Sequence, residues 1–252
     1  MISNRFITDL KKQNWVAVIS DFLVVVIGIL VAMQLSSWEH ARNEKQLANE
    51  YVALLIDDLK FDQQSAEQTI SYYSTVQEFG NHALTLWDDK PALSPEKMVI
   101  AFYQASNILA NNSAVGSYNA LAATGRLGLI GGPALAAKLS GYYAQDLDAI
   151  IYHNTQYRMV IRGILPVNVQ LSIRDNCNEF VEGEILNELL GAHCNTGLSQ
   201  NELNTLLSDL KNRVNLDYYL RQKISQDELA VRILRLRTNG ALSLQKTLKN
   251  FL

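Results

Sequence analysis

The most apolar part of the chain lies near its amino terminus, where the run FLVVVIGILVAM (22–33) holds no charged side chain. The uncharged stretch continues to Trp38, and the segment 15–38 is 24 residues long, close to the ~20 that a helix needs to cross the hydrocarbon core of a bilayer. Trp15 and Trp38 bracket this segment, as aromatic residues do at membrane interfaces. The pattern therefore predicts a single transmembrane helix over residues 15–38.

A short apolar centre is also typical of the h-region of a signal peptide, so cleavage is the alternative to an anchor. Two features favour the anchor. No small-x-small cleavage site follows the apolar run in the usual place, and the helical pattern continues without a turn through residues 39–59. We therefore expect the span to remain uncleaved.

The orientation of the span follows from the basic residues that flank it. Three precede it and two follow it closely: Arg5, Lys11 and Lys12, then Arg42 and Lys45. Because basic residues are enriched on the cytoplasmic side, this small excess places residues 1–14 in the cytoplasm as a short tail. Residues 39–252 are then expected to form a periplasmic domain, anchored in a bacterial inner membrane by one span.

One face of the predicted span differs from the rest. At 100° per residue, Asp21, Gly28, Ala32 and Ser36 fall within an arc of roughly 80°. Small residues in this spacing let two helices approach closely in lipid, which predicts a packing face toward a second copy or another membrane protein. Asp21 could then face inward and bind a cation or relay protons, or it could lie at the cytoplasmic headgroups, where it needs no partner beyond water.

Helical periodicity extends over the rest of the chain. Apolar residues recur at spacings of mostly three, four and seven from Leu47 to Trp87, which predicts one helix from about Trp15 to Trp87, with a break near Gly80 as the alternative. Further helices are expected after Ser94–Pro95, over 117–124, over 133–165 and after the capping boxes Ser199–Glu202 and Ser225–Glu228, with Asn239–Gly240 ending or bending the last one. No stretch alternates convincingly as a strand. The predicted fold class is all-α: a transmembrane helix that continues into a long helix, followed by an antiparallel helical bundle.

The two cysteines of the chain, Cys177 and Cys194, stand among polar and turn-forming residues. We expect them in a loop excursion over residues 166–198, with one short helix at 180–190. A disulfide between them would fit an oxidising compartment and the periplasmic placement, whereas two free thiols would fit a reduced one.

Composition and motifs narrow the chemistry. The chain has 252 residues with 48% hydrophobic and 19% charged residues and a net charge of −3, so it lacks the basic excess typical of nucleic-acid binding. The glycines near 131–132 lack the Gly-Lys-Ser/Thr ending of a phosphate loop, and Cys177, His193 and Cys194 do not have the spacing of a metal site. Neither a cofactor nor a metal is expected, and no catalytic constellation can be inferred.

Most of the first 145 residues resemble a bacterial family of uncharacterised single-span membrane proteins, and the carboxyl third is similar to it only in helical character. The resemblance rests on the apolar run followed by Trp38 and a charged helix, VVVIGILVAMQLSSWEHARNEKQLANEYVALLIDDLKFD, and on SYNALAATGRLGLIGGPALAAKLSGYY in the middle of the chain. This chain has Asp21 where many members are expected to have Glu. The resemblance implies a membrane location and a helical architecture, and it brings no activity and no site residues.

These patterns favour a non-enzymatic, membrane-anchored periplasmic protein that acts through protein–protein interaction, as a scaffold, assembly factor or sensor-like subunit. Its expected partners are the lipid bilayer and, through the span, a second copy or another membrane protein. The alternative is a single-span subunit of a proton- or ion-coupled membrane complex that uses Asp21. An enzyme is the least favoured class, because the plentiful acidic residues show no paired-carboxylate spacing.

Overall fold

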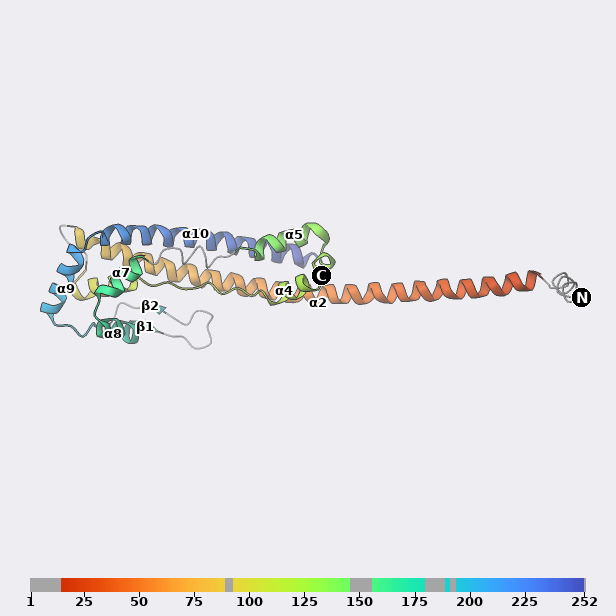
Figure 1. Ribbon diagram of the computed structural model, residues 1–252, viewed down its shortest axis with the longest axis horizontal. Coiled ribbons are helices and arrows are strands. Elements are labelled where there is room, and N and C mark those ends of the chain that lie inside the picture. The colour runs from red at the N-terminus through yellow and green to blue at the C-terminus, as the bar shows by residue number, and fades with distance from the viewer. Residues whose placement is uncertain (1–14, 89–92, 146–155, 180–188, 191–193, 252) are drawn as a thin grey trace, which may run out of the picture. The chain divides into compact units, whose positions relative to one another are not determined.

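The computed structural model describes residues 15–88, 93–145, 156–179, 189–190 and 194–251 (Figure 1). In chain order the elements are α2 (Trp15–Leu84), the 3-10 helix η1 (Thr85–Trp87), α3 (Pro95–Gln104), α4 (Gly116–Ala123), the 3-10 helix η2 (Leu127–Leu129), α5 (Gly132–Tyr143), α7 (Gln156–Ile164), α8 (Val167–Cys177), β1 (Asn178–Glu179), β2 (Leu189–Leu190), α9 (Gln200–Asn212) and α10 (Leu216–Lys249). The predicted all-helical character is confirmed for these residues. The described strands, β1 and β2, have only two residues each and pair antiparallel.

The long amino-terminal helix is confirmed. The helix α2 is 70 residues long, passes Gly80 without a break and tightens into η1, which ends at Trp87. Its length follows from the sequence, since no proline occurs before residue 91 to remove a backbone donor. The chain divides into two compact units between Glu50 and Tyr51, and each is described separately below.

The core of the second unit follows α2 and α10, and among the described residues it consists of three groups of buried side chains. The largest joins the end of α2 to α3, α7, α8, α9 and the start of α10. A smaller group joins residues 52–59 of α2 to α4, η2, α5 and the end of α10. Between them, Ala66 and Tyr73 of α2 pack with Val231 and Leu234 of α10.

Hydrogen bonds fix how α10 lies alongside α2 (Figure 1). Gln77 donates to the carbonyl of Ile224 over 3.2 Å, and Gln245 donates to the side chain of Gln63 over 3.4 Å. Successive turns of α10 therefore meet progressively earlier turns of α2.

The predicted loop excursion over 166–198 is wrong for its first part, which is the helix α8. Pro166 ends one helix, as predicted, but a proline also suits the start of the next, and α8 begins directly after it. Val169, Ile173 and Cys177 recur every four residues and are all buried, which is the stripe of a packed helix. Of the predicted short helix at 180–190, residues 180–188 lie outside the described part of the chain, and Leu189–Leu190 form β2.

Some of the other predicted helix boundaries are confirmed, and others are wrong. The capping box of Ser199 and Glu202 is present, and Pro95 is the first residue of α3. The predicted helix over 133–165 is not continuous, because α5 ends at Tyr143 and α7 begins at Gln156, with 146–155 outside the described residues. The predicted cap at Ser225 is wrong, since α10 begins at Leu216 and runs unbroken through Ser225 and Asn239–Gly240.

Candidate functional site

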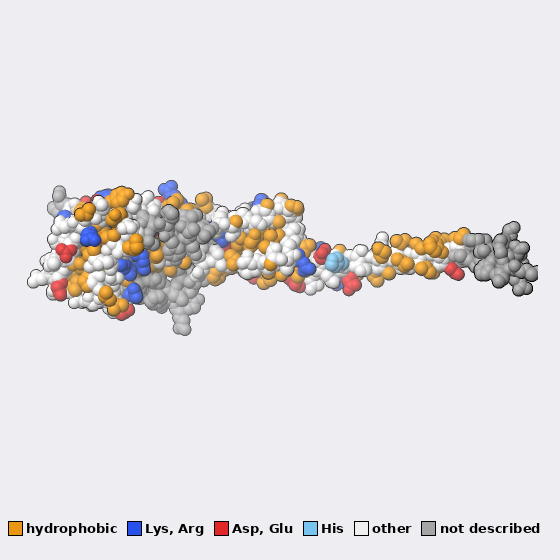
Figure 2. Space-filling model, viewed as in Figure 1, with side chains coloured by type: hydrophobic (Ala, Val, Ile, Leu, Met, Phe, Trp, Pro, Cys, Tyr) orange, Lys and Arg blue, Asp and Glu red, His pale blue; other side chains and the backbone are white. Residues whose placement is uncertain are grey.

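The first candidate site is the apolar part of α2 in the first unit. Its large side chains are exposed, with Phe22 at 66% and Val24 at 68%. Figure 2 shows hydrophobic side chains covering this stretch of the helix. Among the described residues, α2 is the one helix that is both long enough and apolar enough to cross a membrane, by its length and composition.

The four residues predicted to form a packing face lie on this helix, so their shared arc follows from the helical geometry of α2. Asp21, Gly28, Ala32 and Ser36 are all exposed. In the described part of the chain, a Cβ added at Gly28 would meet no atom within 4 Å. The face is therefore open to a neighbour, while its packing role stays a prediction.

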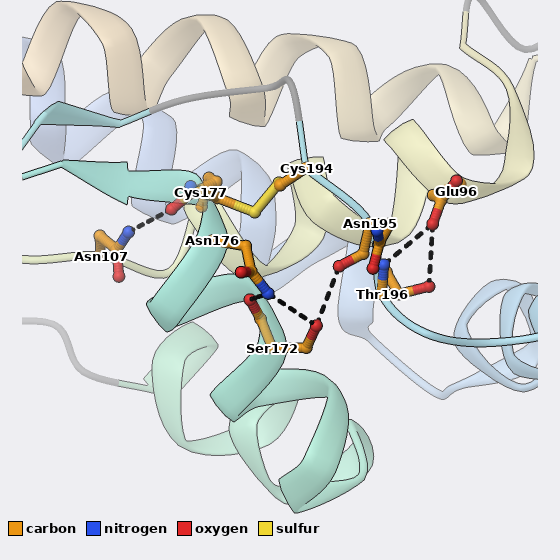
Figure 3. The surroundings of a disulfide bond; sticks show 9 residues. Glu96, Asn107, Ser172, Asn176, Cys177, Cys194, Asn195 and Thr196 are labelled. Atoms are coloured by element: carbon orange, nitrogen blue, oxygen red, sulfur yellow. Dashed lines mark hydrogen bonds between the residues drawn. A yellow bond between two sulfur atoms is a disulfide. The ribbon is translucent and has the colours of Figure 1, made fainter.

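The second candidate site is the cysteine pair (Figure 3). Cys177, at the end of α8, and Cys194 form a disulfide with Cα atoms 5.2 Å apart. Cys177 is buried in the largest core group. The disulfide therefore ties the segment that begins at Cys194 to the core.

Two further contacts hold the segment after the disulfide (Figure 3). Ser172 of α8 donates its hydroxyl to the carbonyl of Asn195 over 3.0 Å. The backbone N–H of Thr196 donates to Glu96 of α3 over 2.9 Å. The segment is thereby fastened to α8 and α3 independently of the sulfur bridge.

A buried ionic cluster in the second unit was missed by sequence reasoning. Asp62 of α2 and Arg237 of α10 are 0% and 3% exposed and form an ion pair over 2.9 Å. The other oxygen of Asp62 accepts the backbone N–H of Ala114 over 2.7 Å. Tyr142 of α5 donates to Asp62 over 2.8 Å, and its ring lies 3.7 Å from the guanidinium carbon of Arg237. The cluster joins α2, α5 and α10.

The electrostatics of this cluster keep the phenol of Tyr142 protonated. Burial raises the pKa of Tyr142 far above its usual value, and the charge of Asp62 raises it further. Burial and the same carboxylate also raise the pKa of Tyr143. A phenol that stays protonated remains a hydrogen-bond donor to Asp62, which suits a structural role for the cluster rather than proton transfer near neutral pH.

A second buried ion pair lies within α10. The ammonium of Lys223 bonds both oxygens of Asp227 at 2.6 Å. Burial is the main cause of two pKa shifts: it raises the pKa of Asp227 to about 6 and lowers the pKa of Lys223. Each charge is thus costly to bury and is retained because the other lies beside it.

A third polar group joins α7 to the end of α3. Arg162 is half-buried and donates to Ser106 Oγ over 2.8 Å, to the hydroxyl of Tyr103 over 2.6 Å and to Asn107 Oδ1 over 2.6 Å. Arg158 donates to the carbonyl of Ser106 over 2.9 Å. Burial lowers the pKa of Arg162 to about 10, so the guanidinium is still charged at neutral pH.

A cleft of about 300 Å³ lies between α2 and α3, with both apolar and ionisable side chains around it: Phe79, Leu93, Ile100, Glu78, His82 and Lys97. His82 lies 3.8 Å from Glu78 on the same helix. One carboxylate and two basic groups line the cleft. Its ionisable groups are therefore of both kinds, and they favour neither an anionic nor a cationic ligand. Among the described residues, no group of three or more His, Cys, Asp or Glu side chains could hold a metal ion.

Comparisons of the chain with protein-family models, with curated proteins and with solved structures found no match.

Proposed function

We propose that this chain is a single-pass anchored protein of a bacterial inner membrane, whose second unit acts in the periplasm by binding other proteins. The observation that carries the proposal is the exposed apolar stretch of α2. The resemblance to single-span membrane proteins supports it. The second unit is then an antiparallel helical bundle, which the order of contacts between α2 and α10 supports.

The free energy of insertion supports the anchor. Ten Leu, Ile, Phe and Val residues occur between 22 and 35. Each contributes about −0.3 to −0.6 kcal/mol at the centre of a span, or roughly −3 to −6 kcal/mol together. Asp21 would cost about 3 kcal/mol at the centre but less toward the interface, six residues after Trp15. The apolar residues of the span therefore offset the cost of Asp21.

The compartment follows from two features that support each other. The basic excess before the span favours a cytoplasmic amino terminus. The disulfide between Cys177 and Cys194 is typical of an oxidising compartment, which in bacteria is the periplasm. Thiol labelling of intact cells tests this placement of the second unit. Alkylation by a maleimide reagent should require prior reduction, and labelling without reduction would count against a periplasmic domain.

Interaction through the span would use the face of Asp21, Gly28, Ala32 and Ser36. Neighbouring serines provide a matched pair of variants, because Ser36 lies on this face and Ser37 lies 100° away from it. We expect Ser36→Leu to reduce cross-linking of the span to a second copy or to a membrane-protein partner in native membranes, and Ser37→Leu to leave it unchanged. Equal cross-linking in both variants would refute the packing face, and recovery of the chain in the soluble fraction would refute the anchor.

The alternative function, an ion-coupled subunit, depends on the carboxylate of Asp21. It predicts that Asp21→Asn abolishes activity of the complex while the span still inserts. Under the interaction function, Asp21→Asn should leave both the activity of the complex and partner cross-linking intact. The same variant therefore separates the two hypotheses.

A further inference from the structure

Three basic side chains that are buried or half-buried in the second unit differ in their partners. Lys223 is paired with Asp227 and Arg237 with Asp62, at 2.6 and 2.9 Å. Arg162 is half-buried and bonds only the neutral oxygens of Tyr103, Ser106 and Asn107. Within the described part of the chain, no carboxylate lies at ion-pair distance from it. Since buried charges are normally paired, Arg162 is the exception that needs a counter-charge.

The geometry brings a second guanidinium to the same place. Arg158 lies one turn before Arg162 on α7, and both bond Ser106, one through its carbonyl and the other through its hydroxyl. Like charges at this spacing repel each other. Ser106 and its neighbours hold the two guanidinium groups side by side against that repulsion.

Other basic groups add to the positive charge. Arg174 lies one turn after Gln170 on α8, and the side chain of Gln170 donates to the carbonyl of Arg162 over 2.7 Å. Besides burial, the charges of Arg158 and of Arg174 lower the pKa of Arg162. Arg158 also lowers the pKa of Lys223, for which burial is the larger cause. Figure 2 shows Lys and Arg side chains gathered over α7 and α8. Since Asp227 is the carboxylate partner of Lys223 and, among the described residues, none of the three arginines forms an ion pair, this place carries an excess of positive charge.

We propose that Arg158, Arg162 and Arg174 form a binding site for a phosphate-class dianion. A dianion offsets this excess better than a single carboxylate, and the planar fork of a guanidinium matches the oxygens of a phosphate. The three bonds of Arg162 use Nε and one N–H on each of its other two nitrogens, so one N–H on each of these remains to donate. The phosphate belongs to a small soluble molecule or to a lipid headgroup. This site goes beyond the proposed function and does not depend on it.

The test measures thermal unfolding of the full chain in a non-ionic detergent at constant ionic strength. Inorganic phosphate and pyrophosphate should raise the midpoint of unfolding in a saturable way, and acetate should not. An equal effect of acetate, or no effect of either phosphate, would overturn the proposal.

Three variants assign the effect to the site. Arg162→Gln removes the central guanidinium and should weaken phosphate binding roughly tenfold or more. Because Arg162 also holds α7 to α3, Arg174→Gln is the second variant, at an exposed position where the fold should be unchanged. Arg232→Gln on α10, where the arginine pairs with Glu228, is the control and should bind phosphate as the wild type does. Unchanged binding in both Arg162→Gln and Arg174→Gln would refute the site.

A second arm separates the two sources of the phosphate. Vesicles of phosphatidylglycerol and of phosphatidylcholine are added to the detergent-free chain in nanodiscs of neutral lipid. Binding to phosphatidylglycerol vesicles that Arg174→Gln removes would identify a lipid headgroup. A response to inorganic phosphate without vesicle binding would identify a small soluble ligand. The absence of both responses would overturn the proposal.

Discussion

Two of the i, i+4 ion pairs within α10 differ sharply in burial. Lys223 and Asp227 are 2% and 6% exposed, whereas Arg232 and Glu228 are 70% and 42% exposed. Both pairs are i, i+4 on one helix, although the basic residue comes first in the buried pair and second in the exposed one. Apolar replacements of each residue, singly and together, therefore measure what burial does to an ion pair. The variants are Lys223→Met and Asp227→Leu for the buried pair, with Arg232→Met and Glu228→Leu as controls.

The expected magnitudes differ by several kcal/mol. Removal of one partner of a buried pair leaves an uncompensated charge in the core and costs about 3–5 kcal/mol. In a unit of about this size, that lowers the melting temperature by roughly 6–20 °C. Replacement of both partners of the buried pair should be close to neutral, because no buried charge remains. Each control replacement should cost less than about 1 kcal/mol.

The assay is unfolding of the full chain in detergent, followed by the fluorescence of Trp87. This side chain packs on Phe102 in the core, with ring centroids 5.8 Å apart. Trp15 and Trp38 are replaced by Phe in all variants, so that the tryptophan fluorescence comes from Trp87 alone. The reasoning fails if the single replacements at Lys223 and Asp227 cost no more than the controls. It also fails if their double replacement costs the sum of the two single ones.

The remaining predictions concern the close packing of Gly80 against α10, the disulfide and the titration of Asp227. A Cβ at Gly80 would lie 2.8 Å from a side chain of α10, so Gly80→Ala should cost about 1–3 kcal/mol, whereas Gly141→Ala, with open space around it, should be neutral or stabilising in the same unfolding assay. Cys177→Ala removes a disulfide that spans 17 positions and should cost about 3 kcal/mol, with no further loss on addition of reductant. Burial raises the pKa of Asp227 from 3.8 to about 6, so the folded state binds this proton more tightly than the unfolded state. The contribution of Asp227 to the free energy of unfolding should therefore be full below about pH 4 and lost as the pH rises through 6, and Asp227→Asn should remove this part of the pH dependence.

Local patterns were sufficient to predict several elements of the fold. An apolar run without proline predicts the length of α2, and a serine three residues before a glutamate predicts the start of α9. The cysteines could be paired because the chain contains only two. Each of these features depends on residues that are close in sequence or unique in the chain.

The wrong cap at Ser225 and the missed ionic cluster have a common physical cause, which is that burial of polar residues leaves no trace in a local pattern. Lys223 and Asp227 have the spacing of an ordinary solvated pair, so the polar stretch around Ser225 was interpreted as a helix start instead of the buried middle of α10. Asp62 and Arg237 are 175 positions apart, and only the packing of α2 against α10 brings them together. The polar interior of the second unit could therefore be found only from the structure.

The positions of the buried charges along α10 indicate what they contribute. Lys223 and Asp227 fall between Leu220 of the largest core group and Val231 of the middle group, and Arg237 falls between that middle group and Ala241 of the third. Apolar and ionic layers thus alternate along the contact with α2. A purely apolar contact between two long helices could slide by whole turns at little cost, because one leucine layer resembles the next. A slide here would separate Arg237 from Asp62 and place a charge against leucines, at a cost of several kcal/mol. The ion pair of Asp62 and Arg237 therefore favours one register of α10 on α2, even though it contributes little to the total free energy of unfolding.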